Sequence, residues 1–456
     1  MPTGRTEDSL ATNPREIIRH APMSRGQIYG IIITGLLSIV DGYDLLATAF
    51  VAPALAAQFG VGVGVGGLGI LLSAGLTGTL FGAFLLAPLT DSIGRKPVVL
   101  FSLIFMVLGM GASALCTSLN QLAGTRLFAG IGIGAMMVTV NPIAAELANE
   151  RSRAFVIAIK SIGFPIGGML GGLLAAVLIQ RVGWQSIFII GAVAGLVLII
   201  LVALALPESI GYLIERRPKD ALAKINAVLS GFGHEPLQDL PPASRNTRIP
   251  YLAIFNTQHV FGTVCASLFS FLTWVAIFFF LSWQTHMLTS SGLSMTLAAA
   301  ISGSSSLSGA FGVLFFAFAA KHYDDHLLSV TSVLGLGGAL IVFGLVPANA
   351  WLLGISTAVV GAFITGATIA LYVVTTAAFE GRMLATGSGF VIGVGRIGSA
   401  VAPGFAGALF AQGLDRAWVA SIMGACALAA AIVIWSMPRK ASDVEADNPG
   451  IQQGAR

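Results

Sequence analysis

Charged residues are scarce in this sequence. Asp, Glu, Lys and Arg make up 10% of its 456 residues, against about 25% in a typical soluble domain. Hydrophobic residues make up 56%, so a water-soluble globular fold is excluded and an integral membrane protein is expected. The formal net charge of +4 reflects basic loops, so we expect a lipid bilayer and no nucleic acid as a partner.

Cysteine is rare as well. Cys116, Cys265 and Cys426 lie in or beside separate apolar runs without CxxC spacing, which predicts neither disulfides nor a metal site. A nucleotide-binding loop is also missing, because GIGIGAMM from Gly130 lies in mid-span without a preceding strand or a following Gly-Lys-Ser/Thr. We therefore expect no cofactor, and protons as the coupling ion.

The histidines give no sign of a membrane-embedded enzyme. Such an enzyme needs a nucleophile, a metal cluster or paired histidines at membrane depth. Five of the six histidines lie near span ends or in loops, and His286 lies close to a span boundary. The sequence therefore predicts a protein that is not an enzyme.

Long apolar runs dominate the chain, and each has about the length that crosses a bilayer. The first six lie near 28–50, 66–89, 97–116, 120–146, 153–179 and 184–206. The other six lie near 256–284, 295–320, 327–347, 350–378, 384–411 and 416–437. The sequence predicts an all-α integral membrane protein of twelve transmembrane helices in two six-helix bundles, 28–206 and 256–438. The remaining parts are tails at 1–27 and 439–456 and a linker at 207–255.

Basic residues set the expected topology. Most Lys and Arg of the short loops lie on the side of both termini, whereas Arg181 and Arg416 alone lie on the opposite side. By the positive-inside rule, both termini and the linker are expected in the cytoplasm. The first apolar run is too long for a signal peptide and is expected to remain a span. We expect a monomeric, multi-pass protein of a bacterial inner membrane.

The two halves of the chain resemble one another. The segment GAFLLAPLTDSIGRKPVVL from Gly82 aligns without gaps with GVLFFAFAAKHYDDHLLSV from Gly312. Internal duplication of this kind is a recurrent plan of secondary transporters. Glycines four residues apart, such as Gly163 and Gly167, predict helices whose backbones touch.

Five ionisable residues lie well inside the predicted spans: Asp41, Asp44, Arg126, Lys160 and Arg396. Each costs about 2.5 to 3.5 kcal/mol at a helix centre, so such residues are normally paired and functional. Helix rise puts Asp41, Asp44 and Arg126 at one depth, and the i, i+3 spacing puts both carboxylates on one helix face. We predict a proton-coupling site, the alternative being a static ion pair between the first and fourth spans. For Lys160 we favour an amine that snorkels to the cytoplasmic interface.

Several motifs resemble those of the major facilitator superfamily. Asp91, Gly94, Arg95 and Lys96 in GAFLLAPLTDSIGRKP match its signature loop. Arg126 followed by LFAGIGIGA, and GFPIGGMLGG from Gly163, are similar to its motifs in the fourth and fifth helices. Within the superfamily, DGYD, LPESIGYL and GVGRIG most resemble the aromatic acid:proton symporter family.

This resemblance implies import of a benzoate-type or hydroxybenzoate-type acid by proton symport. It also implies that Asp41 and Asp44 serve proton coupling or substrate passage. Two alternatives remain open, namely a proton-driven efflux antiporter of the same fold and a symporter of a non-aromatic organic acid such as muconate. The sequence does not choose among the aromatic acids.

Arg396 is the predicted receptor of the substrate carboxylate. The predicted spans of its half contain no Asp or Glu, and a guanidinium binds a carboxylate through two parallel hydrogen bonds. The alternative is that Arg396 bonds backbone carbonyls or reaches Asp41. Side chains predicted to hold the substrate ring and its hydroxyls are Trp274, Phe280, Trp283, Gln284 and Tyr372.

A cytoplasmic gate is the last predicted feature. The resemblance implies that Asp91, Gly94, Arg95, Lys96, Glu146 and Glu208 belong to it, as a network that joins helix ends in one conformation. In the second half, Lys321 stands where the first half has Asp91, and Asp324 and Asp325 stand at Gly94 and Arg95. We interpret these three residues as a substitute gate of inverted polarity.

Overall fold

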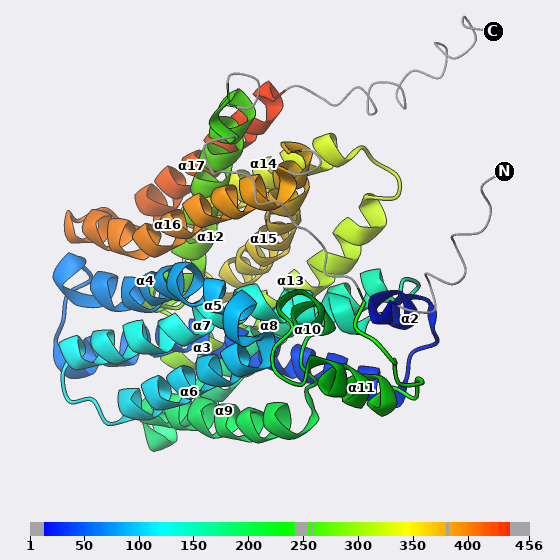
Figure 1. The fold of residues 1–456 in the computed structure, drawn as a ribbon. Coiled ribbons are helices and arrows are strands. Elements are labelled where there is room, and N and C mark those ends of the chain that lie inside the picture. Colours follow the sequence, from blue (N-terminus) through cyan, green and yellow to red (C-terminus); the bar gives the residue numbers. More distant parts are fainter. Residues whose placement is uncertain (1–12, 242–253, 257–259, 380–382, 438–456) are drawn as a thin grey trace, which may run out of the picture. The chain divides into compact units, whose positions relative to one another are not determined.

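The computed structural model describes residues 13–241, 254–256, 260–379 and 383–437. Residues 1–12 of the first predicted tail, residues 242–253 of the predicted linker and the predicted tail at 439–456 lie outside the described residues. The labelled elements of the described chain are all helices (Figure 1).

The first of two compact units contains the described parts of residues 1–61, 70–247 and 295–303. Its long helices are α3 (Arg25–Phe59), α4 (Ile70–Leu85), α6 (Arg95–Ala114), α7 (Leu119–Leu147), α8 (Arg153–Val182) and α9 (Gln185–Ala205). Its short helices are α2 (Pro14–His20), α5 (Ala87–Ile93), α10 (Ile210–Arg216) and α11 (Ala221–Gly231). Within this unit α3 packs along α8, α4 along α7, and α6 against α7 and α9.

The second unit contains the described parts of residues 62–69, 248–294 and 304–456. It is built from the short η1 (Val65–Gly69) and from α12 (Val260–Ser290), most of α13 (Met295–Ala319), α14 (Asp325–Leu345), α15 (Ala350–Ala377), α16 (Leu384–Ala411) and α17 (Arg416–Ser436). In this unit α12 packs against α16 and α17, and α14 packs against α15 and α17.

Twelve of the described helices are long and apolar enough to cross a membrane, which confirms the predicted all-α architecture. The first is longer than the predicted 28–50. Ser24 and Gln27 form a capping box at its start, and the helix continues through Pro53 to Phe59. Proline is tolerated inside a span when neighbouring groups satisfy the freed backbone, and Gly60 ends the helix with a φ of 61°.

Glycines bring α3 and α8 into backbone contact, as their spacing predicted. A Cβ atom on Gly167 would overlap the carbonyl oxygen of Ile39, and a Cβ atom on Gly42 would overlap that of Phe164. No larger side chain fits at either position unless the helices separate. The contact therefore fixes the level of Asp41, beside Gly42, against the residues of α8 around Phe164.

Candidate functional site

Asp44 and Arg126 form a buried ion pair between α3 and α7. Arg126 donates from Nη1 to Oδ1 of Asp44 at 2.7 Å and from Nη2 to the backbone oxygen of Asp44 at 2.9 Å. Asp44 is 0% exposed and Arg126 is 1% exposed, and the guanidinium also lies 5.5 Å from the ring centre of Phe188. The two residues thus meet, as their common depth predicted.

This ion pair leaves hydrogen-bonding capacity unused. Among the described residues, Oδ2 of Asp44 and Nε of Arg126 have no hydrogen-bond partner. Removing one member of a buried pair costs about 3–5 kcal/mol, because the other charge is left uncompensated. The two charges therefore compensate one another inside the protein, and loss of the Asp44 charge would leave Arg126 without its counterion.

Asp41 lies one turn from Asp44 on α3 and is 8% exposed. Lys160 of α8 interacts electrostatically with it, and the Lys160 amine donates to Oδ1 of Asn141 on α7 at 2.5 Å. The interpretation of Lys160 as a snorkelling residue is therefore wrong. The depth of Lys160 could be predicted from the sequence, but the neighbours that α3 and α7 place beside its amine could not. Asn141, a polar residue inside a span, was the signal that sequence reasoning missed.

The orientation of α3 is also fixed from its other side. Tyr43 is 6% exposed, and its hydroxyl donates to the backbone oxygen of Ile187 on α9 at 2.7 Å. Because Tyr43 points toward α9, its neighbours Asp41 and Asp44 are held facing α8 and α7. The two carboxylates therefore have different cations as neighbours, Lys160 for Asp41 and Arg126 for Asp44.

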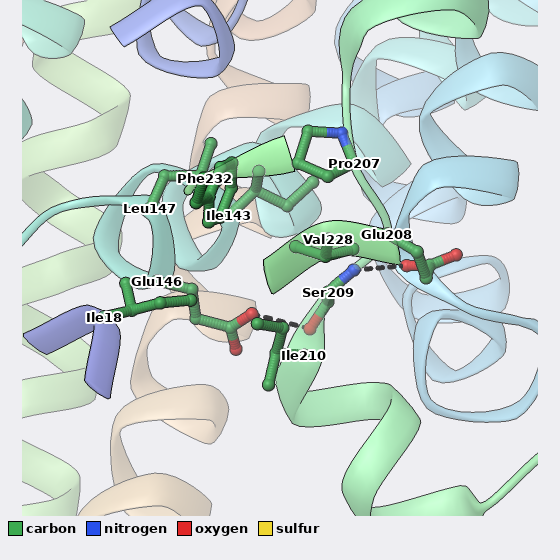
Figure 2. Close-up of a pocket in the computed structure, with 10 residues that line it drawn as sticks. All are labelled: Ile18, Ile143, Glu146, Leu147, Pro207, Glu208, Ser209, Ile210, Val228 and Phe232. Atoms are coloured by element: carbon green, nitrogen blue, oxygen red, sulfur yellow. Dashed lines mark hydrogen bonds between the residues drawn. The ribbon is translucent and has the colours of Figure 1, made fainter. Parts of the chain in front are cut away.

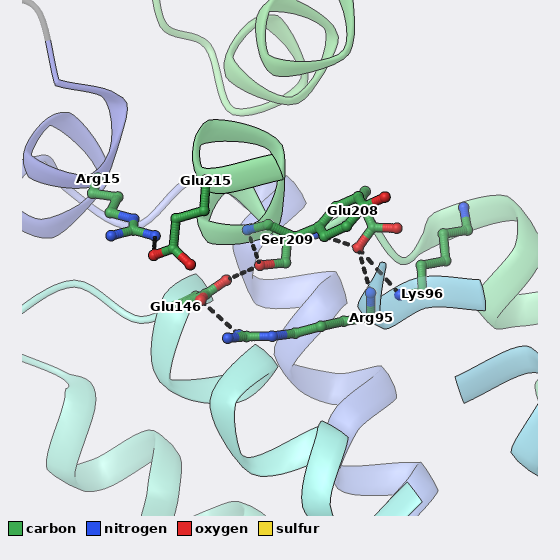
Figure 3. Close-up of polar contacts among 8 residues, drawn as sticks. Arg15, Arg95, Lys96, Glu146, Glu208, Ser209 and Glu215 are labelled. Carbon is green, nitrogen blue, oxygen red and sulfur yellow. Dashed lines mark hydrogen bonds and ion pairs between the residues drawn. The ribbon is translucent and has the colours of Figure 1, made fainter. Parts of the chain in front are cut away.

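A second polar cluster lies at the end of the first unit where α2, α10 and α11 gather, which we term the charged end (Figure 1). Arg95 donates to Oε1 of Glu146 at 2.6 Å, and the Ser209 hydroxyl donates to Oε2 of Glu146 at 2.6 Å (Figure 3). Oε1 of Glu208 accepts from the backbone N–H groups of Arg95, Lys96 and Ser209. Glu208 thereby caps the N-terminus of α6, where a negative charge is favourable.

The backbone of Gly94 makes this cap possible. Gly94 has a φ of 104°, a conformation that glycine adopts readily and other residues rarely do. A Cβ atom there would lie 2.5 Å from Oε2 of Glu208, so a side chain at this position would displace the Glu208 carboxylate. The glycine of the predicted signature loop is thus needed both for its φ and for the approach of Glu208.

A small pocket adjoins the network at the charged end (Figure 2). Apolar residues of α2, α7 and α11 line it together with Glu146, Glu208 and Ser209. The helix α2 is an element that the sequence did not predict. Its Ile18 is buried at 4% exposure, while Arg15 pairs with Glu215 at 2.7 Å and Arg19 with Glu150 at 2.9 Å. The signals for α2 were Asn13 and Pro14, a typical cap and first-turn residue.

Other predicted gate residues lie apart from this network. Asp91 is exposed on α5, and among the described residues it forms no ion pair. In the second unit, Asp324 caps α14 by accepting from the N–H of Leu327 at 3.0 Å. Neither Asp324 nor Asp325 forms an ion pair with Lys321 within the described chain.

The predicted substrate-binding residues are dispersed within the second unit. The guanidinium of Arg396 lies over the Trp274 ring at 5.1 Å from its centre. Phe280, Trp283 and Gln284 are each 0% exposed, and they contact Phe343, Pro403 and Ser305 respectively. Tyr372 is 50% exposed. The structure thus brings together Arg396 and Trp274, and it encloses three of the other side chains in protein.

Known proteins resemble the chain along most of its length. A gallate transporter of Pseudomonas putida is 29% identical over 423 residues, covering 92% of this chain and 94% of that protein. The 4-hydroxybenzoate transporter PcaK of Acinetobacter baylyi is 29% identical over 427 residues, covering 92% and 93%. The predicted resemblance to aromatic acid transporters is confirmed, and such relatives indicate a transporter and not an enzyme.

Solved structures support the fold. The xylose transporter XylE of E. coli, in a partially occluded inward-open conformation, superposes with a TM-score of 0.73 at 15% identity, covering 92% of this chain and 99% of that one. The sequence profile of the Major Facilitator Superfamily matches residues 34–326. With twelve membrane-length helices and this match over more than half its length, the chain belongs to the major facilitator superfamily.

Proposed function

We propose that this protein imports an aromatic carboxylate of the benzoate or hydroxybenzoate type together with protons, by alternating access. The observation that carries the proposal is the fully enclosed Asp44–Arg126 pair, with Asp41 one turn away. The substrate class is supported by relatives named for gallate, 4-hydroxybenzoate and benzoate. A further relative is named for 3-(3-hydroxy-phenyl)propionate, a compound that also has an aromatic ring and a carboxylate.

Proton coupling follows from the cost of buried charge. Ionised Asp44 is favoured by Arg126 at 2.7 Å, whereas a carboxylate without a nearby cation is favoured in its protonated form. A conformational change that moves α7 relative to α3 would thus change the proton affinity of Asp44. Asp41 and Lys160 form a second acid and base in the same unit. A static ion pair would need no second acid at this depth.

Substrate recognition is proposed to use Arg396 and Trp274 of the second unit. The indole and guanidinium already stack, and both surfaces suit an aromatic acid, since rings stack on indole and carboxylates bind guanidinium. Because Phe280, Trp283 and Gln284 are enclosed in protein, we propose that they hold the helix that bears Trp274 in position and do not contact the substrate. Tyr372 is exposed enough to contact a ligand.

We assign the charged end to the cytoplasm and interpret its network as the gate. Hydrogen bonds of the network link the ends of α6, α7 and α10 through Arg95, Glu146, Glu208 and Ser209. A network of this kind forms in one of the two conformations of a transporter, where it holds the helix ends together, and is broken in the other conformation. Four further residues are proposed to form ion pairs only in the other arrangement of the helix ends: Asp91, Lys321, Asp324 and Asp325. The Lys96 amine links α6 to the last turn of α9 by donating to the backbone oxygen of Ala203 at 2.8 Å.

The test is an uptake panel in proteoliposomes that contain the full chain. Labelled 4-hydroxybenzoate, benzoate, gallate and muconate are each supplied with an inward proton gradient. We expect accumulation of at least one aromatic acid, and collapse of that accumulation when an ionophore dissipates the gradient. Accumulation of muconate alone would overturn the substrate class, and extrusion driven by the same gradient would overturn the direction.

A further inference from the structure

Lys160 and Asn141 form a polar surface inside the first unit that the ion pair of Asp44 and Arg126 does not use. Asn141 is exposed and Lys160 is half-buried, although each belongs to a helix long and apolar enough to span a membrane. Polar side chains at such depth are normally found where they line water-filled space rather than lipid. An ammonium and an amide that are accessible to water offer hydrogen-bond donors to a dissolved anion.

The packing of α3 against α8 places Asp41 within reach of the same ammonium. Gly42 lies against the carbonyl group of Phe164, and Lys160 precedes Phe164 by four residues, about 6 Å along the helix. The flexible four-carbon stem of lysine spans that distance, and the two charges interact. Lys160 therefore has two partners, Asn141 through a direct hydrogen bond and Asp41 through its charge.

The charges around Asp41 can be named for the four helices that pack most extensively against α3, namely α4, α7, α8 and α9. Helix α8 contributes Lys160, and α7 contributes Arg126, which is bonded to Asp44. The sequences of α4 and α9 contain no titratable side chain. On α3 itself, Tyr43 donates to Ile187 and Asp44 is bonded to Arg126. Within these helices Lys160 is thus a cation that interacts with Asp41, and Asp41, Asp44, Arg126 and Lys160 together carry two negative and two positive charges when all four are ionised.

We propose that Lys160 and Asn141 form a carboxylate-binding site that Asp41 opens when it takes up a proton. Ionised Asp41 compensates Lys160, whereas protonated Asp41 leaves the ammonium free to bind an external carboxylate. One proton then enters with one carboxylate, and the region returns to neutrality. This inference rests on the proposed function, and it assigns to the first unit a pH-dependent carboxylate site that is separate from the pH-independent one proposed at Arg396 of the second unit.

The experiment measures binding of 4-hydroxybenzoate to the purified full chain by calorimetry between about pH 6 and pH 8, where a benzoate-type carboxyl group stays ionised. For the parent we expect affinity to fall with rising pH, by up to about tenfold per unit, because the complex is proposed to bind one more proton than the free protein. Asp41→Asn mimics the protonated acid, so we expect its affinity to be independent of pH. Lys160→Gln should lose at least about tenfold in affinity at the lowest pH, which is about 1.4 kcal/mol.

Controls separate a binding role from a structural one. Lys224→Gln makes the same chemical change at an exposed position of α11, and we expect parent behaviour. Lys160→Arg keeps the charge and should keep the pH dependence. The uncharged analogue 4-hydroxybenzamide should bind weakly to the parent and equally to Lys160→Gln, because it offers no carboxylate to Lys160.

Two outcomes would overturn the inference. Parent affinity and pH dependence in Lys160→Gln would show that the carboxylate binds elsewhere. A pH dependence that persists in Asp41→Asn would show that another acid takes up the proton. If the parent binds 4-hydroxybenzoate, either of these results contradicts the inference but not the proposed function. A parent that binds neither 4-hydroxybenzoate nor gallate at any pH would overturn the inference and the substrate class together.

Discussion

Asp44 is a carboxylate enclosed by protein, and the bonded Arg126 guanidinium balances its charge. The side chain of Asp44 is fully buried, and Arg126 donates both to its carboxylate and to its backbone oxygen. Because the backbone bond does not depend on the charge of Asp44, the local geometry can outlast its protonation. The residue is therefore suited to change charge without unfolding its surroundings.

Replacing Asp44 with asparagine tests this role. We expect Asp44→Asn to abolish accumulation of an aromatic acid against its gradient while substrate exchange at equal pH stays measurable, because the amide cannot carry a proton across. Accumulation and exchange are both measured with labelled acid in proteoliposomes. Asp239→Asn, at an exposed position after α11, is the matched control and should accumulate acid as the parent does. Normal accumulation in Asp44→Asn would remove Asp44 from the coupling site.

Arg396 calls for a conservative replacement, since its charge and its planar shape have separate effects. Arg396→Lys keeps the charge and loses both the bidentate fork and the stacking on Trp274. We expect affinity for 4-hydroxybenzoate to fall at least about tenfold, or about 1.4 kcal/mol, by a similar factor at each pH. Calorimetry measures the loss. Unchanged affinity would exclude Arg396 as a carboxylate receptor.

For single residues, the sequence predicted the depth of a residue in the membrane well but predicted poorly the direction in which its side chain points. Helix rise was enough to pair Asp44 with Arg126, because both are fully buried and have few partners to choose from. For Lys160 the same arithmetic gave the right level, but whether its amine points to the interface or to Asn141 depends on the rotation of α8. That rotation is set by Gly163 and Gly167 against α3, a contact whose partner the sequence does not name.

At the scale of elements, the charged end joins helices that are distant in the sequence. Glu146 ends α7 and contacts Arg95 at the start of α6 and Ser209 at the start of α10. Glu208 caps α6 through two backbone N–H groups. Two acids thus hold three helix ends, which is the arrangement expected of a gate that opens by losing a few bonds together.

Hydrogen–deuterium exchange of α10 measures how firmly this network holds it. The Arg95 and Glu146 side chains are 22% and 33% exposed, so water screens their pair and its contribution is about 0.5 to 1 kcal/mol. We expect Glu146→Gln to raise amide exchange in α10 about two- to fivefold. Glu150→Gln, which removes the partner of Arg19 on α2, should leave α10 unchanged. Equal amide exchange rates of α10 in the parent and in Glu146→Gln would show that the network does not stabilise α10.

The long helices were predictable from the sequence, whereas the short helix α2 was not. A run of about 20 apolar residues has few alternatives in a membrane, which is why all twelve spans were found. Helix α2 has seven residues, and its stability depends on burying Ile18 beneath α10 and α11 and on ion pairs with Glu150 and Glu215. Such partners come from other parts of the chain, so local sequence gives only the cap at Asn13.

At the scale of the whole molecule, the chain divides the expected tasks between two units. The first contains the buried acids with their cations, and the second contains the stacked Arg396 and Trp274. The duplication seen in the sequence therefore did not preserve the chemistry of the halves. A transporter that couples two fluxes needs a titratable site and a substrate site that respond to the same conformational change.

The most direct test of coupling measures both fluxes in one preparation. Proteoliposomes that enclose a pH-sensitive dye, with no initial pH gradient, receive labelled gallate from outside. We predict that the lumen acidifies in step with gallate uptake in the parent, and that Asp44→Asn and protein-free liposomes show no such acidification. Gallate uptake without acidification beyond that of protein-free liposomes, or with alkalinisation of the lumen, would contradict symport of a proton with the acid.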